Sequence, residues 1–234
     1  MTSALVLQHI HCEVPGIIAN ALESRHIAAH YIRTFEGQPV PGELGDFVGL
    51  IVMGGPMGVY EHDRYPFLQD EMRLIERALK EERPVLGVCL GSQLLASTLG
   101  AVVMKGKRKE IGWYPIRLKE AAMTDRLWEG SEPSFVAYHW HGDIFELPQG
   151  AVSLASSELT ECQAFRYGRG AYGFLFHMEV TQKIIADMVR EFSSELEEEG
   201  VRGEAIITKA QDHLPKLQQI GQVVFDRWVA LLDE

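Results

Sequence analysis

The sequence is poor in cysteine and has no long apolar run. Its three cysteines, Cys12, Cys89 and Cys162, are scattered, and no two of them form a C-x-x-C pair. This pattern excludes a disulfide framework and a zinc ribbon. No apolar stretch approaches the roughly 20 residues that a membrane-spanning helix needs. The first nine residues also lack the basic start and apolar core of a secretory signal. We therefore expect a reducing, cytoplasmic location.

Basic residues are also in short supply. The 234 residues include 22 Lys and Arg against 33 Asp and Glu, a formal net charge of −11. This acidic balance argues against a nucleic acid or an anionic membrane as the main partner. With 46% hydrophobic and 24% charged residues, the composition is that of an ordinary globular protein. The length suits one large α/β domain, or one domain with an appendage.

Hydrophobic periodicity gives the expected order of elements. Short apolar runs alternate with amphipathic helical stretches in the first hundred residues, and buried strands separated by helices predict a mostly parallel sheet covered on both faces. Strand-like runs then dominate the middle of the chain, and two or three amphipathic helices follow residue 181. The expected strands are 4–7, 30–35, 48–53, 84–88, 113–118, 134–138, 152–155, 163–167 and 171–176, and the expected early helices are 16–25, 67–82 and 92–99.

The strongest chemical signal is the stretch Gly87-Val-Cys-Leu-Gly91 between a predicted strand and a predicted helix. It has the form of a G-x-nucleophile-x-G elbow, with cysteine as the nucleophile. Flanking glycines allow a tight turn that strains the central residue and exposes it at a helix N-terminus. The helix end favours the thiolate form, and the Leu90 amide is free to bind a developing oxyanion. The alternative is a buried core cysteine between packing glycines.

A cysteine nucleophile needs a base, and His177 is the best placed of the nine histidines. It follows an apolar run, and Glu179 lies two residues further on. Residues i and i+2 of an extended chain point to the same side, so Glu179 can orient the His177 ring. Carboxyl ends of strands are where open α/β sheets place their sites. The alternative is a polar strand end that leads into a helix.

Other polar clusters are weaker signals. Gly54-Gly55-Pro56 follows a buried strand and allows close backbone approach to a ligand, but no G-K-[ST] is present. The H-x-H pairs at 139–141 and 9–11 lack a clear third or fourth ligand, so we expect no metal site. We interpret residues 139–143 as a polar loop that holds a small ligand, and 110–113 as a stretch that packs an aromatic ring.

Together these motifs resemble the class I, triad-type glutamine amidotransferases, in particular free-standing proteins similar to the amidotransferase domain of GMP synthetase. The resemblance covers roughly residues 1–181, and the motifs occur in the family's order. They are Gly54-Gly55-Pro56, Gly87-Val-Cys-Leu-Gly-Ser-Gln93, His141-Gly-Asp143 and Phe176-His-Met-Glu179. The resemblance implies a three-layer, flavodoxin-like fold with a twisted sheet and helices on both faces. We expect residues 182–234 to form a C-terminal helical extension packed on the same domain.

The resemblance also implies a role for each matching residue. Cys89 would attack the side-chain amide of glutamine and form a γ-glutamyl thioester, while His177 moves the protons and Glu179 orients His177. The backbone amides of Gly55 and Leu90 would form the oxyanion hole. The residues that match the family's substrate site are Gln93, His141, Gly142 and Asp143. We expect no cofactor and no metal.

Two positions depart from the family pattern. Met178 stands where the commonest family ending, F-H-P-E, has proline, so a rigid φ is lost while both functional side chains remain. Trp140 precedes His141, where many members carry a small polar residue, and this bears on recognition of the amino-acid end of the substrate.

Three functions remain open from the sequence. The first is a glutaminase half-reaction whose ammonia goes to a separate synthetase subunit, because this chain contains no P-loop. The second is a γ-glutamyl peptidase with the same thioester chemistry and a different leaving group. The third is a non-catalytic regulatory or binding protein, against which the intact Cys89, His177 and Glu179 argue. We expect a small-molecule substrate, and we expect that the chain can form a homodimer.

Overall fold

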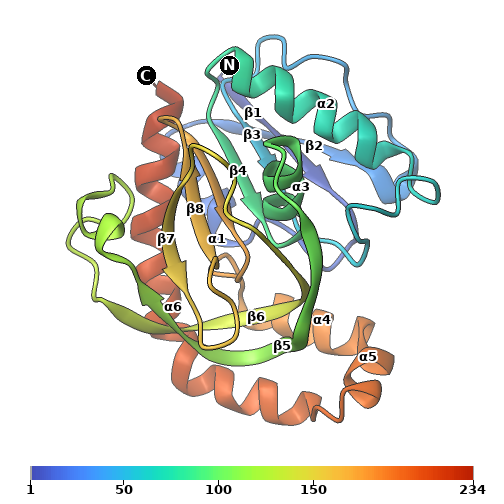
Figure 1. Cartoon of the computed structure of the whole chain (residues 1–234), viewed down its shortest axis with the longest axis vertical. Helices are drawn as coiled ribbons and strands as arrows, with labels where there is room; N and C mark the ends of the chain where they lie inside the picture. The colour runs from blue at the N-terminus through green and yellow to red at the C-terminus, as the bar shows by residue number, and fades with distance from the viewer. Residues whose placement is uncertain (1, 234) are drawn as a thin grey trace.

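The computed structural model describes residues 2–233, which form one nine-stranded sheet with helices on both faces (Figure 1). The strands are β1 Ser3–Gln8, β2 Ala28–Arg33, β3 Leu50–Val52, β4 Val85–Val88, β5 Val103–Leu118, β6 Ser134–Phe145, β7 Val152–Ser156, β8 Ala164–Tyr167 and β9 Ala171–Phe174. The α-helices are α1 Ile17–Ser24, α2 Phe67–Lys80, α3 Leu90–Thr98, α4 Gln182–Glu191, α5 Ser193–Glu198 and α6 Gly203–Ala230.

The sheet joins a parallel half to an antiparallel half, in the order β2-β1-β3-β4-β9-β8-β7-β5-β6. β2, β1, β3, β4 and β9 pair in parallel, and every pairing from β9 onwards is antiparallel. This confirms the predicted three-layer α/β fold. Because the parallel strands run the same way, the segments after β1, β3, β4 and β9 meet at one edge of the sheet, where α/β proteins place their sites.

Two apolar cores lie on opposite faces of the sheet, and alternation along the strands assigns side chains to them. In β1, Ala4 and Val6 join the core that contains α1 and α6, whereas Leu5 and Leu7 join the core that contains α2 and α3. All four side chains are fully buried. The continuous apolar runs in the sequence are therefore strands that are covered on both faces.

The C-terminal helices follow the boundary expected at residue 181. α6, red in Figure 1, runs along most of the length of the molecule and packs against α1, α4 and the strands β5 and β6. Its side chains Phe225 and Trp228 are fully buried in the first core. At Gly221 an added Cβ would lie 2.8 Å from the Met178 carbonyl oxygen. We propose that residues 182–234 extend the domain and complete its core.

The strands β5 and β6 are longer than predicted. They pair over most of their length, with an irregularity between Lys105 and Glu110. The prediction of a loop at residues 139–143 is wrong, because this stretch lies inside β6. Pairing of His139 with Gly112 and of His141 with Glu110 extends the ladder through polar residues that periodicity assigns to a loop.

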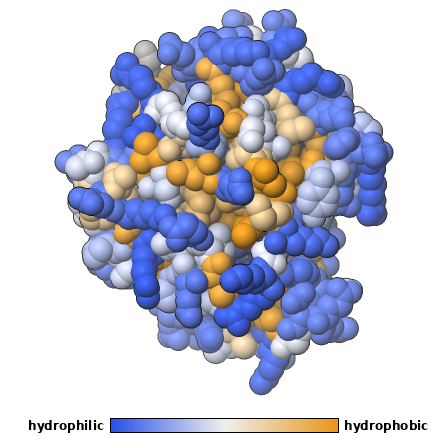
Figure 2. Space-filling view, viewed as in Figure 1, coloured by the Kyte–Doolittle hydropathy of each residue, from blue (hydrophilic) through white to orange (hydrophobic). Residues whose placement is uncertain are grey.

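Among the described residues, no helix is long and apolar enough to span a membrane. Figure 2 shows apolar residues gathered towards the middle of one face, with hydrophilic residues around the periphery.

Replacement of Trp228 by alanine tests the contribution of α6 to the core. Trp228 is fully buried, so we expect Trp228→Ala to lower the free energy of unfolding by about 3–5 kcal/mol, as large-to-small core substitutions do. Urea unfolding followed by far-ultraviolet circular dichroism measures this change. Val223→Ala is the matched control on the same helix, because the Val223 side chain is 46% exposed. A Trp228→Ala variant that is as stable as this control would show that Trp228 of α6 does not contribute to the core.

Candidate active site

The turn between β4 and α3 holds Cys89 in a strained conformation. Its φ of +49° lies in the left-handed region that non-glycine residues rarely adopt, so the strain predicted for the elbow is confirmed. Gly91 must lack a side chain, because a Cβ there would lie 1.9 Å from the Val52 carbonyl oxygen. Gly87 must also lack a side chain, because a Cβ there would lie 2.5 Å from the Gly91 carbonyl oxygen. The Cys89 N–H donates to the Phe174 carbonyl at 2.8 Å, which joins the turn to β9.

The thiol of Cys89 is buried beside the backbone of β6. Its Sγ lies 3.5 Å from the Trp140 carbonyl oxygen. Burial raises the pKa of Cys89, and the nearby His177 and the Leu90 backbone only partly oppose this effect. The helix end does favour the thiolate through the Leu90 backbone, but burial outweighs this effect and the pKa of Cys89 is raised overall. Deprotonation of Cys89 requires a base at the site.

His177 and Glu179 form a buried pair after the end of β9. The His177 Nδ1 lies 2.7 Å from the Glu179 Oε1, although Met178 stands between them instead of proline. The backbone N–H of His177 donates to the Tyr138 carbonyl at 2.8 Å, so β6 fixes the backbone of this segment. Burial alone would lower the pKa of His177, but Glu179 and Cys89 raise it well above its ordinary value. The pair makes His177 a stronger base.

The two amides that we expect in the oxyanion hole lie on neighbouring segments. Gly55 follows β3, and a Cβ added there would lie 3.0 Å from the Leu90 side chain. Leu90 is the first residue of α3, where backbone N–H groups have no partner within the helix. The Leu90 N–H faces the Cys89 thiol and favours its ionised form.

The expected substrate residues are only partly gathered. The Gln93 side chain donates to the Asp143 carbonyl at 3.3 Å, which brings α3 and β6 together. Gly142 packs against Lys109, whose Cγ would lie 2.9 Å from an added Cβ. The His141 side chain points elsewhere, because its Nε2 lies 3.4 Å from Glu110 Oε2.

His9 holds the glycine turn after β3, and sequence reasoning did not assign it this place. Its Nδ1 lies 2.9 Å from the Gly54 carbonyl oxygen, and its Nε2 lies 2.8 Å from a Glu71 carboxylate oxygen on α2. Both side chains are buried. Burial alone would lower the pKa of His9, but Glu71 raises it above its ordinary value. The signal in the sequence was the H-x-H pair at 9–11 after an apolar strand, which does not reveal Glu71 as the partner of His9.

Glu13 is a second residue that sequence reasoning missed. Its carboxylate packs against Gly54, because a Cβ on that glycine would lie 1.7 Å from Glu13 Oε2 and 3.5 Å from the Cys89 Cβ. Glu13 is 5% exposed and makes no hydrogen bond or ion pair with the described residues. Burial raises its pKa to about 7, with His177 opposing the shift and Glu179 adding to it. A carboxyl group of changeable charge therefore lies beside the nucleophile.

The C-terminal segment reaches the site through Trp140. The Trp140 Nε1 donates to Glu195 of α5 at 2.8 Å, and Lys109 Nζ lies 2.8 Å from the other oxygen of the same carboxylate. The Phe192 ring packs on Trp140 with centroids 5.5 Å apart. Because the Trp140 carbonyl contacts the Cys89 thiol, α5 helps to fix the wall beside the nucleophile.

The other two cysteines are free, buried thiols. Burial raises the pKa of Cys12 to about 12 and that of Cys162 to about 11, which disfavours the reactive thiolate.

The chain matches the family model of class-I glutamine amidotransferases over residues 12–194. It is 35% identical over 191 residues to the glutamine amidotransferase-like protein YfeJ of Salmonella typhimurium, covering 80% of each protein. It is 34% identical over 144 residues to the glutamine-hydrolysing GMP synthase of Thermosipho africanus, covering 61% of this chain but 26% of that longer protein.

Solved structures extend the likeness to almost the whole chain, including the C-terminal helices. A glutamine amidotransferase of Thermotoga maritima is 33% identical with a TM-score of 0.88, and covers 97% of this chain and 98% of its own. A glutamine amidotransferase of Methylobacillus flagellatus is 27% identical with a TM-score of 0.90, covering 99% and 95%. The chain belongs to the class I glutamine amidotransferase family.

Proposed function

We propose that this protein hydrolyses the side-chain amide of glutamine through a thioester on Cys89. The observation that carries the proposal is the meeting of three features at one sheet edge. They are the strained Cys89 after β4, the His177–Glu179 pair after β9, and the Gly55 and Leu90 amides. This arrangement joins a nucleophile, a base with its orienting carboxylate, and oxyanion donors, as acyl transfer requires.

The proposed reaction has two steps. His177 takes the Cys89 proton as the sulfur bonds to the amide carbon, and the Gly55 and Leu90 amides stabilise the oxyanion. The carbon–nitrogen bond then breaks, and His177 returns the proton to the nitrogen, so ammonia leaves. Water next attacks the thioester with His177 as base, which releases glutamate and restores the thiol.

The amino-acid end of glutamine has a proposed site near the start of α3. Gln93 and the backbone of His141, Gly142 and Asp143 supply polar groups on this side. The hydrogen bond from Gln93 to the Asp143 carbonyl supports the idea that α3 and β6 jointly form the site.

The use of the ammonia is a further part of the proposal. A relative from Ignicoccus hospitalis, 33% identical over 142 residues, is one of the subunits of a glutamine-hydrolysing GMP synthase, and this chain covers 71% of it. The present sequence has no P-loop, so we propose that a separate synthetase subunit takes the ammonia.

A γ-glutamyl peptidase is the second candidate, and Trp140 is the observation that favours it. The Trp140 ring is held by Glu195 and Phe192 of the C-terminal segment, and the Trp140 carbonyl lies beside the nucleophile. A wall fixed in this way can select a leaving group larger than ammonia. Comparison of turnover with glutamine and with γ-glutamyl dipeptides separates the two candidates.

Substitution of Cys89 tests the proposal directly. We expect Cys89→Ala to abolish release of ammonia or amine and to prevent labelling by a glutamine-analogue diazoketone, because both need the thiolate. Ammonia release and mass spectrometry of the labelled chain measure the two effects. Cys162→Ala is the matched control, since this cysteine is also buried. If the unaltered protein neither turns over glutamine or γ-glutamyl compounds nor takes up the label, the protein is a non-catalytic member of its family.

Substitution of Glu179 tests the base. Because Glu179 raises the pKa of His177, we expect Glu179→Gln to lower it. The rise of kcat/KM with pH should then move to lower pH, while its plateau falls by about 10²- to 10⁴-fold, the usual contribution of acid–base catalysis. Glu191→Gln on the solvent side of α4 is the control. An unchanged pH profile in Glu179→Gln would exclude the proposed role.

A further inference from the structure

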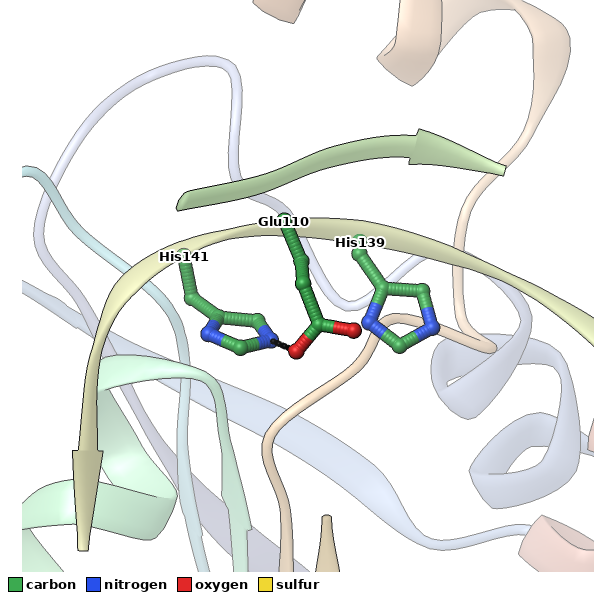
Figure 3. Close-up of side chains that lie close together, drawn as sticks. All are labelled: Glu110, His139 and His141. Carbon is green, nitrogen blue, oxygen red and sulfur yellow. Dashed lines mark ion pairs between the residues drawn. The ribbon is translucent and has the colours of Figure 1, made fainter. Parts of the chain in front are cut away.

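Three ionisable side chains meet on one face of the β5–β6 pair (Figure 3). Glu110 lies opposite His141 in the strand register, and His139 is two residues away on the same strand, so all three point to the same side. One possible ligand atom from each lies within 4.8 Å of the others. All three residues are buried.

Several polar atoms of this cluster lack a protein partner. Four buried atoms make no hydrogen bond of acceptable geometry among the described residues. They are both ring nitrogens of His139, Nδ1 of His141 and Oε1 of Gln163. The Tyr114 backbone lies near the His139 ring, and the Asp143 backbone lies near the His141 ring. A buried polar group without a hydrogen-bond partner destabilises the folded state, so four such atoms in this cluster call for a ligand.

The chemistry of these donors suits a metal cation. A neutral imidazole binds a metal through a ring-nitrogen lone pair, and neither ring nitrogen of His139 has a hydrogen-bond partner among the described residues. The Glu110 carboxylate accepts hydrogen bonds from Ser157 and Thr160 at 2.7 Å and from Gln163 at 2.9 Å. Such contacts are the outer partners that orient a carboxylate ligand.

We propose that Glu110, His139 and His141 bind one Zn²⁺ ion, with the Gln163 side chain as an outer partner that donates to Glu110. Two imidazoles and a carboxylate form a donor set that zinc takes readily. Zinc–ligand distances of about 2.0–2.2 Å place ligand atoms roughly 3.4 Å apart, so rotation of the histidine rings must close the cluster by about 1 Å. Full burial of the three ligands favours a structural ion that ties β5 to β6.

Metal content and spectroscopy test this site without an activity assay. Protein produced with added zinc should contain one Zn²⁺ per chain by plasma mass spectrometry. Protein stripped by a chelator should regain thermal stability with Zn²⁺, and with Co²⁺ it should show the intense visible bands of tetrahedral cobalt. His139→Ala and Glu110→Gln should lose these responses. His213→Ala is the control, because His213 stacks on Trp113 outside the cluster.

The result on the unaltered protein decides the matter even if a variant fails to fold. Substoichiometric zinc together with no cobalt bands would overturn the proposal and leave the cluster as a buried network that holds water. Full zinc content retained in a folded His139→Ala variant would overturn it as well.

His9 carries a second inference from a different observation, and this one rests on the proposed function. The Gly54 carbonyl and the Glu71 carboxylate can only accept hydrogen bonds, so both ring nitrogens of His9 must donate and the ring is a cation. In a trans peptide the carbonyl and the following N–H point in opposite directions. A donor that holds the Gly54 carbonyl therefore aims the Gly55 N–H the other way.

We infer that His9 is a positioning residue for the oxyanion hole, and that Glu71 keeps it charged. Removal of one oxyanion donor costs about 10²- to 10³-fold in kcat, and a donor that is only misaligned should cost less. The effect should fall on the transition state, because the amide carbonyl of bound glutamine carries little charge. The KM for glutamine should therefore change little.

Kinetics with a transition-state mimic test this role. We expect His9→Gln to lower kcat for glutamine about 10- to 100-fold. The affinity for an aldehyde analogue of glutamine should fall by a similar factor. Binding of glutamate, which forms no oxyanion, should be unchanged. Glu71→Gln should show a smaller loss of the same kind, and His11→Gln, whose side chain is 65% exposed, should show none.

Two outcomes separate failure of this inference from failure of the proposed function. An unaltered protein that turns over no glutamine and binds no aldehyde would remove the proposed function itself. An active protein whose folded His9→Gln and Glu71→Gln variants keep both kcat and aldehyde affinity would overturn only the role of His9.

Discussion

The left-handed backbone of Cys89 is the constraint on which the rest of the site depends. A non-glycine residue at φ +49° costs about 1–3 kcal/mol, and it persists only where its surroundings fix it. Here β3 and β9 do so: the Val52 carbonyl fills the space at Gly91, and the Phe174 carbonyl accepts from the Cys89 N–H. Both strands belong to the parallel half of the sheet. The same sheet that strains the nucleophile thus brings the base and the oxyanion segment to it.

The antiparallel half of the sheet gives β6 two faces with different tasks. Its backbone at Tyr138 and Trp140 contacts His177 and Cys89 respectively, and the Trp140 side chain is held by α5. The side chains of His139 and His141 point to the buried cluster with Glu110 instead. Because alternate residues of one strand serve these two tasks, a shift of the β5–β6 register by one residue would exchange them.

Sequence reasoning found what local patterns encode and missed what tertiary pairing creates. The strands β1, β3 and β4 are apolar on both faces, and the elbow has its own glycine spacing, so both were predictable. The length of β6 was not, because pairing with β5 overrides the loop-like stretch from His139. The stretch 110–113 was interpreted only as one that packs an aromatic ring, because the partners of Glu110 lie far along the chain, at residues 141 and 157–163. Glu71 lies 62 residues from His9, a separation at which one sequence gives no pairing signal.

Glu13 differs from the other buried carboxylates around the site. Glu71, Glu110 and Glu179 each have hydrogen-bond partners, whereas Glu13 has none among the described residues. A lone carboxylate in this place favours positive charge on His177 and His9 and disfavours negative charge on Cys89. With a pKa near 7, its own charge is nearly balanced between the two forms. Protonation of Glu13 would ease formation of the Cys89 thiolate, whereas its ionised form would attract a departing ammonium or amine. The same carboxyl group can therefore oppose the first half of the proposed reaction and assist its end.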